Sequence, residues 1–66
     1  MRFNDDERAR FNVAIAEATM KLIEIGLHMS VGREDVFEID DQLDSVRQRI
    51  ASAGKEVTAA IERIEA

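Results

Sequence analysis

The sequence predicts an all-α protein, an antiparallel hairpin of two long helices that dimerises into a four-helix arrangement. The 66 residues include no proline, so no ring interrupts a long helix. The apolar residues recur at alternating spacings of three and four, which is the period of a helix with one buried face. A chain of this length holds a single domain, residues 1–66. With no cysteine and one histidine, disulfides and Cys-based zinc sites are excluded as supports for a small core.

The first helix is expected at about residues 5–29. Its heptad row has spacings of 4, 3, 4, 3 and 4 and consists of Phe11, Ile15, Ala18, Leu22, Ile25 and Met29. Asn4 followed three residues later by Glu7 is a variant of the capping box, which predicts the helix start. Gly32 is the expected left-handed residue after the helix, and Gly26 is the alternative end point. The loop at about 30–33 is so short that the two helices must run antiparallel.

The second helix is expected at about residues 34–64. Its row continues for four heptads and consists of Val36, Ile39, Leu43, Val46, Ile50, Ala53, Val57, Ala60 and Ile64. Asp35 with Glu38 three residues on offers another cap. Gly54 lies inside this helix, where glycine costs about 1 kcal/mol relative to alanine. We therefore expect a kink at Gly54, or a close contact with a neighbouring helix.

A second apolar row runs along the first helix, about 160° around from the first row at 100° per residue. It consists of Ala9, Val13, Ala16, Met20, Ile23 and Leu27. The second helix can cover only one of these two rows, and each large side chain left exposed forgoes ~1.5–3 kcal/mol of burial. We expect a second copy of the chain to cover this row through a dimer interface of Val13, Ala16, Met20, Ile23 and Leu27. The alternative is an obligate contact with a different protein.

The start of the second helix is strongly acidic. Residues 34–44 include six acidic residues and no basic one, namely Glu34, Asp35, Glu38, Asp40, Asp41 and Asp44. Acids in a first helical turn stabilise it, but Asp40, Asp41 and Asp44 lie beyond that turn. Together with Phe37 they are the candidate partner-binding residues. The alternatives are a purely structural role, a divalent metal site or mimicry of nucleic acid for the acids, and for Phe37 a ring folded back over the loop.

Residues that would support catalysis are scarce. The charged stripe of the first helix is expected to face solvent, with an ion pair between Glu17 and Lys21, and consists of Arg10, Glu17, Lys21, Glu24 and His28. His28 and Glu24 fall short of the ligands a metal site needs. A Ser30–His28–Asp35 triad would have no pocket to shelter a substrate in so thin a hairpin. We expect no catalytic residue, no cofactor and no bound metal.

The expected function is protein–protein binding by a small non-enzymatic dimer. Such a protein would regulate or inhibit a host protein, as small helical proteins encoded by phages and mobile elements do. The net charge of −5 resides entirely in residues 34–66 and disfavours binding to phosphate backbones. One alternative is a nucleic-acid binder that uses Arg2, Arg8, Arg10, Arg47, Arg49 and Arg63. A second alternative is a structural subunit of a larger helical assembly.

The longest uncharged run, residues 25–32, has eight residues, whereas a membrane-spanning helix needs about 20 apolar ones. Arg2 and Phe3 lead directly into acidic residues instead of the apolar core of a secretory signal. We therefore expect a cytoplasmic protein that does not contact membranes.

Overall fold

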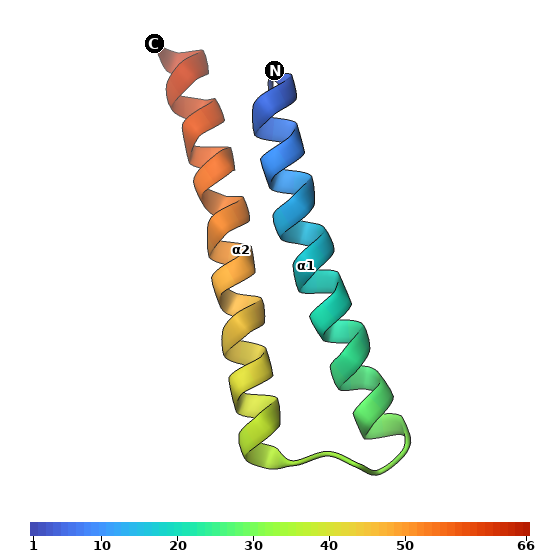
Figure 1. Cartoon of the computed structure of the whole chain (residues 1–66). Coiled ribbons are helices and arrows are strands. Elements are labelled where there is room, and N and C mark those ends of the chain that lie inside the picture. Colours follow the sequence, from blue (N-terminus) through green and yellow to red (C-terminus); the bar gives the residue numbers. More distant parts are fainter.

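The chain forms a helical hairpin. The computed structural model describes all 66 residues. They form two α-helices and no strand, with α1 at Asp5–Ser30 and α2 at Val36–Glu65. The helices lie side by side and antiparallel, with both termini at one end and the loop at the other (Figure 1). The molecule is a rod of 50 × 17 × 14 Å. Neither helix has a stretch that is long and apolar enough to cross a membrane.

The predicted capping box begins α1. The Asn4 side chain accepts a hydrogen bond of 2.8 Å from the Glu7 backbone N–H, and the Glu7 carboxylate accepts one of 2.7 Å from the Asn4 N–H. These two bonds satisfy donors that a helix start leaves free. Phe3, which precedes the cap, packs against Phe11 with 5.2 Å between the ring centroids and an angle of 32° between the ring planes. The chain that enters α1 is therefore held both by the cap and by this aromatic contact.

The turn between the helices is set by Gly32 and Asp35. Gly32 adopts a left-handed φ of 67°, and the N–H groups of Gly32 and Arg33 donate to the carbonyls of Met29 and His28. This is a Schellman ending, and it shows that α1 continues through Gly26. Asp35 accepts from two backbone N–H groups as the cap of α2. The helix consequently begins at Val36, two residues later than expected.

The contact between the helices is made mainly of small side chains. The buried apolar residues are Ala14, Ala18, Val46, Ala53 and Ala60, each at most 6% exposed. Alanine adds little bulk beyond the backbone, so the two helices can approach closely along this line. The same choice leaves little apolar volume between them, and no large side chain is fully buried.

Several large members of the two predicted heptad rows are exposed, which corrects the expectation from the spacing at these positions. The exposed fraction is 39% for Ile15, 50% for Leu22, 53% for Met29 and 54% for Ile50. Both helices are turned so that the alanines meet and charged residues close one side of the contact. Only alternate members of each row therefore face the other helix, and the others lie along one open side of the hairpin.

The helix glycines have no role within the single chain. α2 continues through Gly54, and a Cβ built at Gly54 or at Gly26 would meet no atom within 4 Å. The close helix contact expected at Gly54 is thus absent from the hairpin itself.

A buried polar group interrupts the contact near the loop. Gln42 is 8% exposed, and its side-chain oxygen has no hydrogen-bond partner. A buried acceptor without a partner carries the full cost of leaving water. Buried hydrogen-bonding groups are therefore less well paired in the loop half of the hairpin than in the half that carries the termini.

The alanine contact predicts that added bulk is harmful at one position of α2 and tolerated two residues away. Ala53→Leu should lower the free energy of unfolding by about 1–3 kcal/mol, because a larger side chain must push the helices apart. Ala51→Leu, at an exposed position of the same helix, should change it by much less. Urea denaturation at one fixed protein concentration measures both, and equal effects would show that the helices are not in close contact at Ala53.

The buried amide of Gln42 predicts a stabilising substitution. Gln42→Leu should raise the free energy of unfolding by about 1–3 kcal/mol, because it removes an unpaired buried acceptor and keeps a similar volume. Gln48→Leu is the control, since Gln48 is exposed and hydrogen-bonded to Asp44. A loss of stability in Gln42→Leu would mean that the amide has a partner in solution.

Candidate protein-binding surfaces

Ion pairs between the helices close one side of the hairpin. Arg10 bonds Glu56 at 3.0 Å, and Arg49 approaches Glu17 at 2.6 Å. Arg10 and Glu17 face solvent as expected, with 57% and 49% of their side chains exposed. The expected pair of Glu17 with Lys21 is absent, since Glu17 pairs with Arg49 of α2 while Lys21 pairs with Glu24 at 3.6 Å. Exposed pairs of this kind contribute little free energy, but their charges specify which sides of the helices meet.

The most enclosed polar contact joins the two ends of the chain. The Arg63 guanidinium donates to both oxygens of Glu7, at 3.0 and 2.9 Å, and also to the Arg2 carbonyl at 2.8 Å. The Glu7 side chain is 5% exposed. The hydrogen bond from Arg63 lowers the pKa of Glu7 below its ordinary value of 4.5, and the bond from the Asn4 backbone lowers it further. The same bond raises the pKa of Arg63.

The lowered pKa of Glu7 predicts a loss of stability in acid. A carboxylate with a lowered pKa in the folded state stabilises the fold above its ordinary value of 4.5, and this contribution disappears as the pH falls through the lower folded value. Glu7→Gln should therefore be less stable than the parent at neutral pH, and the difference should shrink below pH 4.5. Thermal unfolding across this pH range measures it. Glu62→Gln, which removes no ion pair, should show no such convergence.

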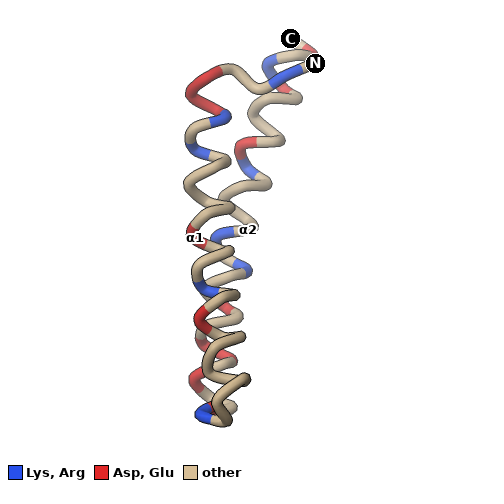
Figure 2. Tube along the Cα trace, turned by 90° about the vertical axis from the view of Figure 1, so that its right-hand side faces the viewer, with Lys and Arg blue, Asp and Glu red and all other residues tan.

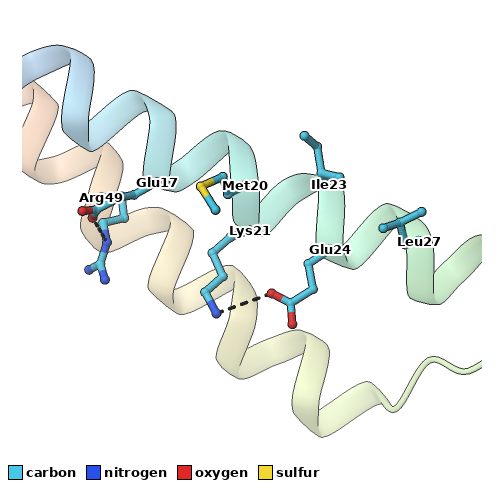
Figure 3. A pocket seen from close by; sticks show the side chains of 7 residues that line it. All are labelled: Glu17, Met20, Lys21, Ile23, Glu24, Leu27 and Arg49. Atoms are coloured by element: carbon cyan, nitrogen blue, oxygen red, sulfur yellow. Dashed lines mark ion pairs between the residues drawn. The ribbon is translucent and has the colours of Figure 1, made fainter.

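The predicted dimer residues lie together on the outer side of α1, which we call the outer row: Val13, Ala16, Met20, Ile23 and Leu27. Val13, Met20, Ile23 and Leu27 are between 57% and 70% exposed. Figure 3 shows Ile23 pointing away from α2, while the ion-paired side chains of Glu17 and Lys21 lie on the side that faces it. The outer row is thus uncovered within the single chain, as the sequence required.

A second uncovered apolar surface draws on both helices, and we call it the open face. It consists of Ile15, Leu22 and Met29 of α1 and Ile50, Val57 and Ile61 of α2, which are between 37% and 54% exposed. The positions of the ion pairs show on which side of the helix contact the open face lies. Arg10 and Glu17 each precede a residue of the helix contact by one position, whereas Ile15 and Leu22 each follow such a residue by four. At 100° per residue, Ile15 and Leu22 therefore lie on the side of the contact opposite to Arg10 and Glu17. On α2, Arg49 precedes the contact residue Ala53 by four positions and Ile50 precedes it by three, which likewise places these two residues on opposite sides of the contact.

The loop end carries the third surface, the acidic end. Phe37 is 82% exposed and Val36 is 77% exposed, so the ring is not folded back over the loop. Asp40, Asp41 and Asp44 are all exposed, and no basic side chain pairs with any of them. Asp41 and Asp44 follow Phe37 by four and seven residues and share its side of α2. Figure 2 shows that Lys and Arg are sparse toward this end of the rod.

The structure therefore leaves the large residues of the outer row exposed, places Asp41 and Asp44 on the same side of α2 as Phe37, and adds a surface that the sequence reasoning missed. The signal for the open face was present in α2. Alternate members of its heptad row form two sets that point to different sides of the helix. One set includes Val46, Ala53 and Ala60, and the other includes bulkier residues such as Leu43 and Ile50. The smaller set faces α1, because it permits the closer approach.

No three His, Asp or Glu side chains come together in a way that could hold a metal ion. Comparison with protein-family models, curated proteins and solved structures finds no match to this chain.

Proposed function

We propose that this chain is a non-enzymatic cytoplasmic protein that acts by binding other proteins, as a regulator or inhibitor. The observation that carries the proposal is the amount of apolar side chain left outside the folded hairpin. Fourteen large hydrophobic residues are more than a third exposed, and ten of them belong to the outer row or the open face. Rows of this kind are typical of protein-interaction surfaces.

The acidic end supports the same function by a different physical route. An exposed aromatic ring beside unpaired carboxylates resembles the composition of binding sites, where the ring anchors the partner and the charges steer its approach. Asp35 is needed as the cap of α2, but Asp40 and Asp41 make no hydrogen bond or ion pair within the chain. We therefore propose that these two carboxylates interact with a partner that presents basic side chains.

The arrangement of the arginines disfavours the nucleic-acid alternative. Of the six arginines considered for it, Arg8, Arg10, Arg49 and Arg63 pair with carboxylates of the same chain. A guanidinium that is already neutralised by a carboxylate contributes little to phosphate binding. We therefore propose a protein as the partner.

Neutralising the acidic end should weaken partner binding without unfolding the chain. In the triple variant Asp40→Asn, Asp41→Asn and Asp44→Asn, we expect slower association with the native partner, which can be isolated from the source cells with immobilised parent chain. The effect should diminish as salt screens the charges. Phe37→Ala should instead speed dissociation, because it removes an anchor. Surface plasmon resonance separates these two rates.

The matched control is Glu62→Gln with Glu65→Gln, which removes acidic charge at the other end of the rod. It should leave partner binding near the parent value. Unchanged binding in both the triple variant and Phe37→Ala would contradict a role for the acidic end. Binding of the parent chain to duplex DNA or RNA with a steep salt dependence, and to no protein, would contradict the proposed function.

A further inference from the structure

We infer that the open face is the self-association surface of this protein and that its occupant is a second copy of the same chain. The inference rests on the proposed protein-binding function and assigns one partner to one surface. Two hairpins stacked by their open faces would bring the six large residues of each copy into one shared core between four helices.

The surface area of the hairpin matches what such a dimer needs. The single chain exposes 5066 Å², whereas a compact protein of 7.4 kDa exposes about 4,200 Å². The excess is close to the roughly 800 Å² that each partner buries in a standard interface. One partner of the size of this chain is therefore sufficient to bring the exposed surface to the ordinary value.

The charge on the open face permits a partner with the same net charge. Each copy carries −5, so a second copy is acceptable only where neither surface is acidic. On α1 the open face is bordered by the uncharged Asn12, Thr19 and Gly26. At the end that carries the termini it is bordered by Arg8, which pairs with Asp5. On α2 the border carries one acidic and one basic residue, Asp40 and Arg47, which form no ion pair but add no net charge to this face. The unpaired negative charge of Asp41 and Asp44 lies on the outer side of α2, away from this face.

The two helix glycines fit the same interpretation. Gly26 and Gly54 each follow a contact residue by one position, which places both on the borders of the open face. Glycine destabilises a helix interior relative to alanine, and neither glycine is required by an atom of its own chain. A helix of a second copy can approach closely at both positions, because neither carries a side chain.

The outer row is the weaker candidate for this role. It belongs to α1 alone and spans residues 13–27, about 20 Å of helix at 1.5 Å per residue. The open face is built from two helices and extends from Met29 to the end that carries the termini, where Phe3, Val57 and Ile64 line a shallow hollow. A second rod of equal length can follow it throughout.

Two neighbouring residues of α1 give a matched test. Leu22 on the open face and Ile23 on the outer row are 50% and 57% exposed, so glutamate at either position is compatible with the single hairpin. The parent chain should sediment at micromolar concentration as a species of about 15 kDa, twice 7.4 kDa. Leu22→Glu should raise the dimer dissociation constant at least about 100-fold, because it buries a charge. Ile23→Glu should leave the dimer intact.

A second measurement keeps the test informative if a separated hairpin unfolds. The chain contains no cysteine, so Leu22→Cys and Ile23→Cys each supply one thiol. The rate at which maleimide modifies the thiol of the Leu22→Cys variant should fall as the protein concentration rises. Once a dimer has formed, the rate should be at least about tenfold lower than for dilute protein, because the thiol is then removed from solvent. The Ile23→Cys variant should react at a constant rate.

A monomeric parent chain would overturn the inference and leave the proposed binding of a different protein standing. Dissociation by Ile23→Glu alone, or protection of the thiol in Ile23→Cys alone, would assign the dimer to the outer row and overturn it as well. Equal effects at both positions, or none at either, would also contradict it, because the interface would then not lie on the open face.

Discussion

Two helices make a single layer, and a single layer cannot enclose a core. Each helix of this hairpin has only one neighbour, so most of its circumference faces outward. The contact line is occupied by alanines, which bring the backbones close but bury little apolar area. The exposed rows of large side chains and the reliance on caps at both helix starts follow from this limit.

The local features of the fold could be predicted from the sequence, because each depends on a few adjacent residues. The capping pair Asn4 and Glu7, the left-handed Gly32 and the cap Asp35 are of this kind. The side on which the helices meet could not be predicted from the heptad spacing, because each row offers two interleaved sets of residues. The choice between them depends on how closely Ala18 and Ala53 allow the helices to approach, and on charges paired across the contact.

Some of the candidate surfaces could likewise be predicted from the sequence, whereas others could not. Periodicity alone identified the outer row, since an apolar residue opposite a covered face must be uncovered. The acidic end was identified from composition, and the exposure of Phe37 required the structure. The open face emerged only when the orientation of both helices was known, because it is defined by the position of Leu22 and Ile50 relative to each other and not by either row alone.

The ion pairs between the helices are confined to one half of the rod. They join Glu7 to Arg63, Arg10 to Glu56 and Glu17 to Arg49, and none lies nearer the loop, where Gln42 is unsatisfied. The hairpin is therefore fastened where its termini meet and is held less firmly toward Phe37. Local opening costs least where contacts are fewest, so the helices should separate more readily at the acidic end than at the end that carries the termini, where the ion pairs preserve their register.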